Sequence, residues 1–548
     1  MTAGWNYADV WEEIADCLPD EVAAMHGPVV LTWRELDERA DGVAGALLDA
    51  GLRRQDKVAQ YMRNRPEYIE SMFAAFKAAL VPVNTNFRYG DDELSYLWDD
   101  SDTAAVVFDA EFTETCDRLR RRLPAVRAWL FVGPAADCPD WAIDYGGAAG
   151  SVRAGGPGGR VRPRWGRSGE DLNLLYTGGT TGLPKGVMWR QHDFFLMIEQ
   201  QYGRQPPEEP DSGAYLSRLS GPGPRVLPAP PLMHGTACWF AMAAMSAGGS
   251  VVTLTEPRFD PRELLETVVS RRVKGVCIVG DAFAKPLLAE LDSDPERFDL
   301  GHVRLVMSSG AMLSRTSKAR LSHYAPKARI VDGLGSSESG SLGTAVTTPG
   351  HVGETGRFRL GPTVRVLDPD GNDVAPGTAE PGRLAIGGHL PLGYYNDPEK
   401  TAATFLTVGG HRYAVAGDFA LVGADGSITL LGRGSTCINT AGEKVFPEEV
   451  EEVLKTAGAV RDAAVVGLPD DRFGEAVVAL VELEGGAPFD ETGLIAHTRE
   501  HIAAFKAPRR IVAVQRIDRL PNGKMDYPAM KAVAGAALGG AARGVPGS

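Results

Sequence analysis

The stretch NLLYTGGTTGLPKG, residues 173–186, combines glycines, threonine hydroxyls and a lysine directly after an apolar run. Glycines let the backbone approach an anion closely and aim several N–H groups at it, while the hydroxyls and the ammonium group add further donors. This is the chemistry that a triphosphate requires. The stretch is not a Walker loop, because no Gly-Lys pair follows at the necessary offset. We expect phosphate contacts from Thr177, Gly178, Gly179, Thr180, Thr181 and Lys185.

Three later motifs place a carboxylate or a lysine next to glycine or serine. They are DGLGSSES (332–339) with Glu338, YAVAGD (413–418) with Asp418, and PNGKMDY (521–527) with Lys524. Taken singly, each has a simple structural explanation as a helix cap, a turn aspartate or a solvated turn lysine. Their order along the chain is what favours a shared function.

The loop YTGGTTGLPKG, 176–186, resembles the phosphate-binding signature of the adenylate-forming superfamily. This superfamily contains acyl- and aryl-CoA synthetases, firefly luciferase and the adenylation domains of nonribosomal peptide synthetases. The later motifs follow in the family's order up to residue 527, so the resemblance covers nearly the whole chain. It implies that a carboxylic acid is activated with ATP and Mg²⁺ as an acyl-adenylate and then transferred to coenzyme A.

The resemblance assigns the DGLGSSES motif to the nucleotide and its metal ion. Glu338, together with the Thr181 hydroxyl, would hold Mg²⁺ against the phosphates, since hard divalent ions prefer oxygen ligands. Ser337 would take the place of the family's threonine beside the nucleotide, and Leu334 stands where the family usually has tyrosine. The remaining residues expected to contact the nucleotide are Gly310, Asp332, Gly333, Leu334, Gly335 and Ser336.

Two further motifs resemble the family's ribose site and hinge. Asp418 would accept hydrogen bonds from both ribose hydroxyls, and Arg433 would contact the ribose or a phosphate. Ser435 stands at the pivot, where the family usually has Asp or Lys.

The C-terminal motifs resemble the parts that serve the two half-reactions. In AGEKVFP (441–447), Gly442 would give pantetheine room to pass, with Lys444 in the same loop. Lys524 would reach the α-phosphate and the substrate carboxylate. A cation is needed there, because attack of a carboxylate on a triphosphate brings negative groups together.

The segment PLMHGTACW, 231–239, resembles the family's substrate pocket. Aligned on Trp239, the aspartate that pairs with an amino-acid substrate is replaced by Gly235, so a bound ammonium group would be unpaired at a cost of several kcal/mol. A non-amino acid is therefore expected. His234 is a candidate to gate or line the pocket, with a packing role as the alternative. The phrases VMWRQHDFF and VGDAFAKPL resemble bacterial acyl-CoA synthetases acting on fatty acids or sterol side-chain acids.

The surrounding sequence alternates helical and strand patterns. A helix is expected at 31–51 and strands at 56–62 and 103–109, while the runs 273–280, 303–310 and 328–335 each end in Gly or Ser. Ligands bind at such carboxyl ends of parallel strands. We predict an α/β protein with a large N-terminal domain of layered α/β sheets plus a β-rich subdomain, and a small mobile α+β C-terminal domain. The expected boundaries are 1–431, 432–535 and a disordered tail at 536–548.

Composition narrows the class of protein. Of the 548 residues, 57 are Lys or Arg and 71 are Asp or Glu, and the net charge of −14 argues against broad nucleic-acid binding. The scattered cysteines indicate reduced thiols rather than a zinc site. The uncharged stretch 235–255 is broken by glycines, which favours a buried helix and strand over a membrane span. With no signal pattern at the N-terminus, we expect a cytoplasmic enzyme. Its partners would be a small carboxylic acid, ATP and CoA, with a homodimer as a candidate assembly.

Three alternatives remain open at this stage. The chain could load a separate carrier protein rather than free CoA, although no carrier attachment motif follows Lys524. It could act as a luciferase-like monooxygenase. It could also bind nucleotide without turnover, given the departures at Leu334 and Ser435.

Overall fold

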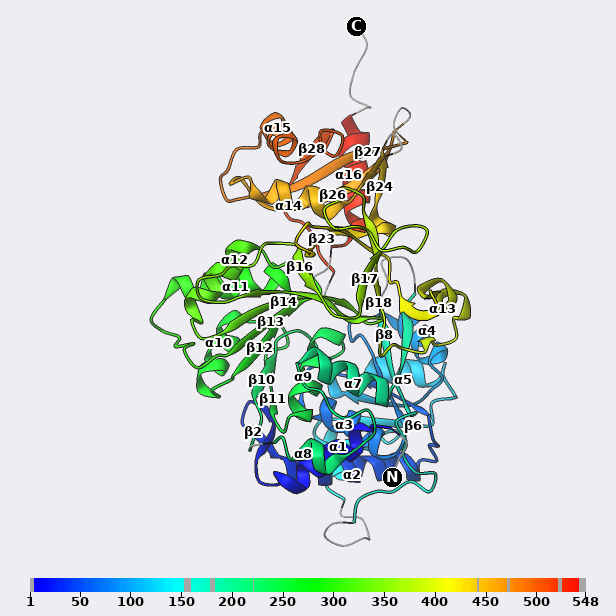
Figure 1. Cartoon of the computed structure of the whole chain (residues 1–548). Helices are drawn as coiled ribbons and strands as arrows, with labels where there is room; N and C mark the ends of the chain where they lie inside the picture. Colours follow the sequence, from blue (N-terminus) through cyan, green and yellow to red (C-terminus); the bar gives the residue numbers. More distant parts are fainter. Residues whose placement is uncertain are drawn as a thin grey trace. The chain divides into compact units, whose positions relative to one another are not determined.

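The computed structural model describes residues 4–151, 159–177, 183–219, 221–440, 443–470, 474–520 and 525–541 (Figure 1). The chain forms two compact units. The first contains Met1–Thr355 and Gly387–Ala414, and the second contains Gly356–Ile386 and Val415–Ser548. Both units combine helices and sheets, so the predicted α/β class is confirmed.

The first sheet of unit 1 is mainly parallel, with an antiparallel strand at each end. The predicted runs at 273–280, 303–310 and 328–335 form three neighbouring strands of this sheet, and the first two of these strands are parallel to their neighbours on both sides. In spatial order the strands are β2 (Val29–Thr32), β1 (Val22–His26), β11 (Ser250–Thr253), β10 (Arg225–Pro228), β12 (Gly275–Ile278), β13 (Leu305–Ser309), β14 (Arg329–Ser336) and β15 (Gly340–Thr347).

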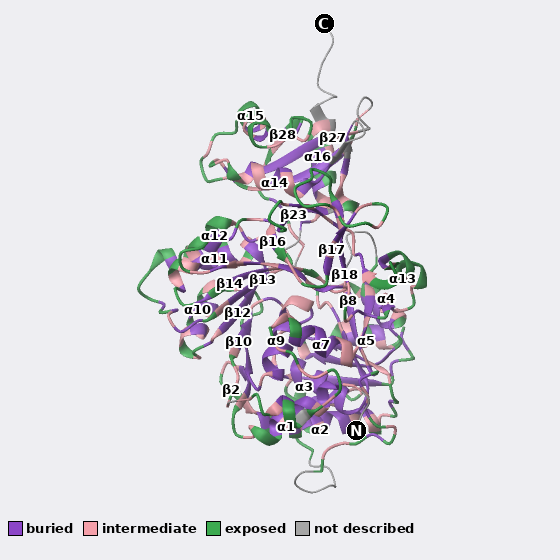
Figure 2. Cartoon of the chain, viewed as in Figure 1, coloured by how far each residue is buried: buried purple, intermediate pink, exposed green. Residues whose placement is uncertain are grey.

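Helices cover both faces of this sheet. Apolar side chains of three helices pack on one face, in a core with the strands: α10 (Pro261–Ser270), α11 (Gly280–Ser293) and α12 (Arg315–Tyr324). On the other face lies α9 (Gly235–Ser246), whose residues from Ala237 to Ser246 are all buried. Burial on both faces explains why strands β11 and β12 are buried along their whole length (Figure 2).

The second sheet of unit 1 carries the predicted phosphate loop. Its strands in spatial order are β19 (Gly393–Tyr394), β9 (Lys185–Arg190), β8 (Leu172–Thr177), β4 (Val81–Asn84), β3 (Lys57–Tyr61), β5 (Thr103–Asp109), β6 (Ala128–Val132) and β7 (Ile143–Asp144). Helices α4 (Asp91–Asp100) and α5 (Thr113–Arg120) pack on one face. Helices α3 (Pro66–Lys77), α7 (Gln191–Gln201) and α9 lie between the two sheets (Figure 1).

The uncharged stretch 235–255 forms α9 and β11, as predicted. In the part of the chain that the structure describes, no helix combines the length and hydropathy needed to cross a membrane.

Helix α2 (Trp33–Asp49) illustrates how local sequence sets an element's limits. Thr32 accepts a hydrogen bond from the Glu35 backbone N–H at 3.2 Å, and the Glu35 carboxylate accepts one from the Thr32 N–H at 2.8 Å. This reciprocal capping satisfies backbone donors that the first helical turn leaves open. The helix expected at 31–51 therefore begins after its cap, and Gly51 follows its end with a φ of 85°.

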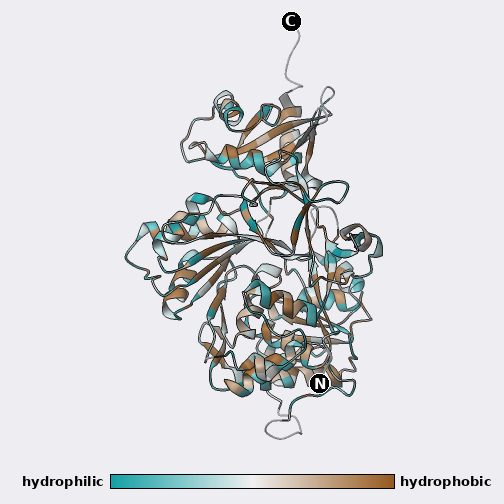
Figure 3. Ribbon diagram, in the orientation of Figure 1, coloured by the Kyte–Doolittle hydropathy of each residue, from teal (hydrophilic) through white to brown (hydrophobic). Residues whose placement is uncertain are grey.

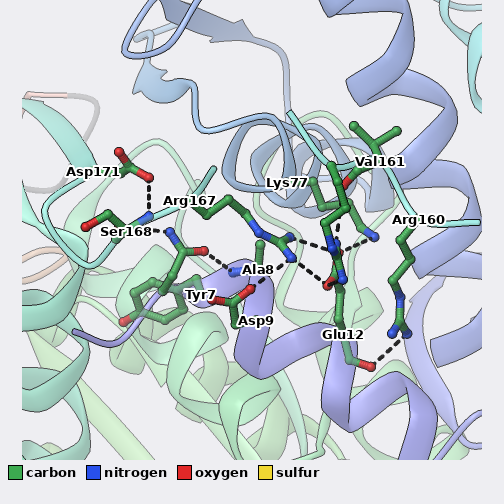
Figure 4. A network of polar contacts seen from close by, with 12 residues as sticks. Tyr7, Ala8, Asp9, Glu12, Lys77, Arg160, Val161, Arg167, Ser168 and Asp171 are labelled. Carbon is green, nitrogen blue, oxygen red and sulfur yellow. Dashed lines mark hydrogen bonds and ion pairs between the residues drawn. The ribbon is translucent and has the colours of Figure 1, made fainter. Parts of the chain in front are cut away.

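A buried ion network joins α1 (Tyr7–Cys17), α2, α3 and the segment that leads into β8 (Figure 4). The Lys77 ammonium group, fully buried, pairs with Glu12, Asp37 and Asp41 at 2.7 to 3.0 Å. The remaining ion pairs of the network are Arg160 with Asp16 and Asp37, Arg162 with Glu12, and Arg167 with Asp9 and Glu12. The three arginines precede β8 in the chain, so this network ties the segment that leads into that strand to α1 and α2.

Unit 2 contains an antiparallel sheet and a smaller α+β part, with apolar residues concentrated in the strands (Figure 3). The antiparallel sheet consists of β16 (Arg357–Leu360), β23 (Ile428–Arg433), β22 (Asp418–Val422), β18 (Gly382–Ile386) and β17 (Val364–Leu367). The α+β part has the strands β25 (Glu443–Val445), β24 (Ile438–Thr440), β27 (Gly474–Leu483), β26 (Val460–Asp470) and β28 (Arg510–Val514). Its helices are α14 (Pro447–Thr456), α15 (Glu491–His501) and α16 (Tyr527–Ala541).

The chain end differs in part from expectation. We expected a disordered tail from residue 536, but α16 continues to Ala541. Alanine is the strongest helix former and offsets the glycines in this stretch, which explains the longer helix. Residues 542–548 of the expected tail lie outside the described residues.

Candidate active site

The predicted phosphate loop connects two antiparallel strands. Thr177, the last residue of β8, lies opposite Lys185, the first residue of β9. This pairing closes the base of the loop and brings the two ends of the motif together. Gly178, Gly179, Thr180 and Thr181 lie outside the described residues.

Tyr176 fixes the end of β8. Its hydroxyl donates to the Asp100 carboxylate at 2.6 Å, and burial together with that carboxylate raises the pKa of the Tyr176 hydroxyl well above its usual value. A Cβ atom at Gly186 would lie 2.7 Å from the Tyr176 ring, so glycine is required where the ring crosses β9. The phosphate loop is thus anchored by a residue just before its first threonine.

Asn84, at the end of β4, joins the phosphate-loop strand to the predicted acid pocket. Its amide oxygen accepts from the Tyr176 N–H at 2.6 Å, and its amide nitrogen donates to the Tyr176 carbonyl at 2.8 Å. The same nitrogen donates to the Met233 carbonyl at 2.7 Å, directly before His234. One amide therefore sets the relative positions of two predicted site segments.

Lys185 forms an ion pair with Asp397, which directly precedes α13 (Pro398–Thr404). The side chains are 39% and 26% exposed, so this pair is only partly shielded from solvent. Asp397 also caps α13, because its Oδ1 accepts from the Lys400 N–H at 2.9 Å. The bond from Lys185, followed by that from the Lys400 backbone, lowers the pKa of the Asp397 carboxyl.

Glu338 lies in the turn between β14 and β15. The hydroxyl of Tyr394 on β19 donates to Glu338 Oε1 at 2.7 Å, and the Trp189 indole on β9 donates to the Ser337 carbonyl at 3.0 Å. The Ser336 N–H donates to the Ser339 hydroxyl at 3.1 Å and tightens the turn. The expected metal ligand and its neighbour Ser337 are therefore held by β9 of the phosphate-loop hairpin and by β19, the strand next to it.

The other residues of the DGLGSSES motif serve the strand itself, through close backbone contacts or packing. A Cβ atom at Gly335 would lie 2.2 Å from the Gly340 carbonyl oxygen, so only glycine fits this crossing. Gly333 lies beside Met307, Ser308 and Ser309 of the neighbouring β13. Leu334 is partly buried on the same strand.

Asp332, expected beside the nucleotide, has its carboxylate in a buried ion pair. Lys318 on α12 lies 2.8 Å from Asp332 Oδ2, and the side chains are 0% and 3% exposed. Lys318 also donates to the Glu354 carbonyl at 3.0 Å. The carboxylate of Asp332 therefore positions β14 against α12.

The predicted pocket residues gather at the start of α9. His234 precedes the helix, and a Cβ atom at Gly235 would lie 3.3 Å from Leu175 and 3.5 Å from the Trp239 ring. Gly310 follows β13 with a φ of 92°, and a Cβ there would lie 3.7 Å from the Thr236 hydroxyl. Leu175 and Trp239 thus lie against Gly235, the position that the resemblance aligns with the aspartate of amino-acid-activating family members.

Unit 2 brings together the two residues predicted for the ribose. Asp418 on β22 and Arg433 on β23 are direct cross-strand partners. The Asp418 residue is 9% exposed, and only the backbone of Arg433 is described. Lys444 lies on β25 with its backbone described, whereas Gly442 lies outside the described residues.

Lys524 also lies outside the described residues. Arg519 and Met525, one on either side of it in the chain, form an antiparallel bridge. Arg519 makes an ion pair with Asp462 at 2.8 Å, which ties the start of this connection to β26.

The described residues include one carboxylate that suits a metal ion bound together with substrate phosphates. Among the described residues, no group of three or more His, Cys, Asp or Glu side chains could hold a metal ion. Magnesium is commonly bound through one or two carboxylates together with substrate phosphates and water. Glu338, with one oxygen bonded to Tyr394, fits such a ligand.

Sequence reasoning missed the groups that hold the predicted residues. Tyr394, Asp397 and Asn84 act through hydrogen bonds or ion pairs with residues far along the chain. The polar run GYYND, 393–397, was a usable signal, because it places hydroxyl and carboxylate groups just before a helix.

Family comparisons match most of the chain. Residues 11–395 match the model of the AMP-binding enzyme family, and residues 449–524 match that of the AMP-binding enzyme C-terminal domain.

Among curated proteins, a medium/long-chain-fatty-acid–CoA/3-oxocholest-4-en-26-oate–CoA ligase of Mycolicibacterium smegmatis is 40% identical over 532 residues, covering 95% of both chains. A 3-oxocholest-4-en-26-oate–CoA ligase of Rhodococcus rhodochrous is 37% identical and covers 95% of this chain and 94% of its own length.

Solved structures give the same fold. The anthranilate CoA ligase AuaEII in complex with anthranoyl-AMP has a TM-score of 0.81 at 22% identity, over 98% of this chain and 99% of its own. ATP-bound MatB from Rhodopseudomonas palustris has a TM-score of 0.79 at 25% identity, over 96% and 99%.

Proposed function

Because the chain belongs to the AMP-binding enzyme family, we propose that it is an ATP-dependent acid–CoA ligase that forms an acyl-adenylate and then an acyl-CoA thioester. The names of its relatives bear out the ligase class, for which ATP, Mg²⁺ and CoA are the standard partners. The structural observation that carries this proposal lies at the segment 393–397. There, Asp397 pairs with Lys185 of the phosphate-loop hairpin, and Tyr394, three residues earlier, bonds to Glu338 of the β14–β15 turn.

In the first half-reaction, the loop 177–185 binds the triphosphate, and Lys185 supplies positive charge to it. Glu338 and Thr181 would hold Mg²⁺, whose charge offsets that of the phosphates. Lys524 approaches the α-phosphate and the substrate carboxylate, where charge increases in the transition state. Asp418 binds the ribose hydroxyls, and Arg433 assists at the ribose or a phosphate.

In the second half-reaction, the CoA thiolate displaces AMP. Residues 432–535 act as a small domain that turns about Ser435, so that the loop around Gly442 and Lys444 replaces Lys524. One chain thereby serves two transition states.

The acid is proposed to be hydrophobic. No carboxylate stands at Gly235 to pair with an ammonium group, and Leu175 and Trp239 line that position. A medium- or long-chain fatty acid, or a sterol side-chain acid, fits this surrounding and the substrates named for the relatives. His234, at the start of α9, would line or gate the acid. CoA-dependent AMP release across short, medium and long fatty acids, aryl acids and sterol acids tests the class.

Replacing Lys524 tests the two-step assignment. For Lys524→Ala we expect acid-dependent pyrophosphate release to fall at least about a hundredfold. Thioester formation from supplied acyl-adenylate should remain largely intact. The matched control is Lys531→Ala, which removes another lysine of unit 2, in an exposed pair with Glu475. Equal loss of both half-reactions in Lys524→Ala would contradict the role given to this lysine.

We also propose the acceptor of the acyl group, the oligomeric state of the enzyme and its place in the cell. Free CoA is the acceptor, and thioester formation with a carrier protein but not with CoA would overturn this choice. We propose action in the cytoplasm, supported by the acidic balance of the chain and by cysteines that form no disulfide among the described residues. A homodimer is the proposed assembly, and light scattering tests it.

A further inference from the structure

The segment Gly393–Asp397 contacts two predicted site residues that lie about 150 positions apart in the sequence. Tyr394 bonds to Glu338, and Asp397 pairs with Lys185. Between them, the Tyr395 N–H donates to the Gly186 carbonyl at 2.7 Å, so the segment follows β9 closely. The expected metal ligand and the expected phosphate lysine are therefore held by one short piece of chain.

Tyr394 is a fixed donor. It is 5% exposed, its N–H donates to the Thr401 hydroxyl at 2.9 Å, and its ring lies 6.0 Å from that of Phe405. Donation to Glu338 Oε1 fixes the orientation of the carboxylate, so that Oε2 can take another ligand. Groups that orient a metal ligand in this way tune its affinity for the metal.

Asp397 divides its two oxygens between two tasks. Oδ1 caps α13 through the Lys400 N–H, and Oδ2 pairs with Lys185. The low pKa of the Asp397 carboxyl keeps it ionised at neutral pH. Because the pair is partly exposed, it is worth little, and a more highly charged anion can replace the carboxylate.

We propose that Tyr394 and Asp397 are positioning residues. Tyr394 orients Glu338 for Mg²⁺. The Asp397 carboxylate occupies the phosphate position beside Lys185 until a phosphate group of ATP displaces that carboxylate. This inference rests on the proposed phosphate role of Lys185 and metal role of Glu338. It predicts that removing the charge of Asp397 strengthens ATP binding. If Asp397 served only to support the fold, its removal would not strengthen ATP binding.

The test of Asp397 is ATP binding to Asp397→Asn, measured by calorimetry without acid or CoA. Asparagine caps helices as well as aspartate does, so α13 is retained. The Kd for ATP should fall about two- to fivefold at low ionic strength, since exposed pairs are worth up to about 1 kcal/mol. The effect should shrink at high salt. Unchanged or weaker ATP binding at low salt would overturn the inference for Asp397.

Two controls separate this inference from the proposed function. Asp260→Asn alters an equivalent cap, at α10, and should leave the Kd unchanged. In a Lys185→Met background, Asp397→Asn should have no effect. If Lys185→Met itself leaves ATP binding unchanged, the phosphate role of Lys185 fails. If Lys185→Met weakens binding but Asp397→Asn does not strengthen it, only the inference fails.

The test of Tyr394 is the Mg²⁺ dependence of ATP binding to Tyr394→Phe, which keeps the ring and its packing. The Mg²⁺ concentration for half-maximal binding should rise about tenfold, with metal-free ATP binding unchanged. The matched control is Tyr395→Phe, whose hydroxyl bonds to Asp102 and Lys57 instead of Glu338. A Mg²⁺ dependence of Tyr394→Phe equal to that of the wild type or of Tyr395→Phe would refute the role of Tyr394.

Discussion

Lys77 and Lys185 both pair with carboxylates, but their surroundings differ. Lys77 is fully buried among Glu12, Asp37 and Asp41, in a network that ties helices together. Lys185 is 39% exposed and contacts Asp397 at the loop end of the β8–β9 hairpin. Buried charges are costly to unpair, whereas a partly exposed pair can exchange its partner. The first arrangement maintains the fold, and the second suits binding of an anion.

The largest expected effect is on Lys77. Lys77→Met would leave three carboxylates without their shared cation, so the free energy of unfolding should fall by about 3–5 kcal/mol in denaturant titrations. Arg34→Met, which removes an exposed pair with Asp20, is the control and should change it by less than about 0.5 kcal/mol. Similar losses in both variants would remove the distinction between buried and exposed pairs.

A smaller effect is expected for Glu12→Gln, and it should depend on pH. Burial opposes ionisation, but hydrogen bonds from Arg167 and the charge of Lys77 hold the pKa of Glu12 well below its usual value. The resulting stabilisation is present above the unfolded pKa, near about 4.3, and is lost as pH falls toward the folded value. The variant should be about 2–3 kcal/mol less stable at pH 7. Unfolding titrations should show this difference shrinking below about pH 5, and a constant difference would refute the assignment.

Asn84→Asp probes a neutral contact near the site. A carboxylate cannot donate to the Tyr176 and Met233 carbonyls, which lie 2.8 and 2.7 Å from the amide nitrogen. The expected loss of unfolding free energy is about 1–3 kcal/mol. Asn372→Asp, in an exposed turn, serves as the control. A stability equal to that of the wild type would show that this amide does not hold the two segments.

The smallest expected effect is on Asp397. Asp397→Asn keeps the cap of α13 and loses only a partly exposed charge pair, so the unfolding free energy should change by less than about 0.5 kcal/mol. A loss above about 2 kcal/mol in the same titration would show that the Lys185–Asp397 pair stabilises the fold as the buried Lys77 network does, and would contradict the difference proposed between them.

Much of the scaffold could be predicted from the sequence. Apolar runs ending in Gly or Ser predicted β12, β13 and β14, and the apolar stretch after His234 predicted a buried helix. These patterns are local, because burial on a sheet or a helix follows a short period along the chain. The motif order placed Lys185 and Glu338 in an expected nucleotide site, although their roles stay predictions.

The partners of the site residues could not be predicted in the same way. Nothing local to Glu338 indicates Tyr394, and nothing local to Lys185 indicates Asp397, because these contacts depend on how β9 pairs with β19. Asp332 shows the same limit, since its motif suggested a nucleotide contact while Lys318, from α12, neutralises its carboxylate. Long-range pairing of charges is set by the packing of whole elements, which a motif does not encode.

The hydroxyl of Thr401 has a consequence for how this region tolerates change. It accepts from the Tyr394 N–H at 2.9 Å and donates to the Asp397 carbonyl at 2.7 Å, and a Cβ atom at Gly393 would lie 2.4 Å from its methyl group. The Thr401 hydroxyl therefore links the backbone of Tyr394 to that of Asp397 and sets the spacing between the Tyr394 phenol and the Asp397 carboxylate. A substitution at Gly393 or Thr401 would therefore shift the partner of Glu338 and the partner of Lys185 together, so one contact cannot change without the other.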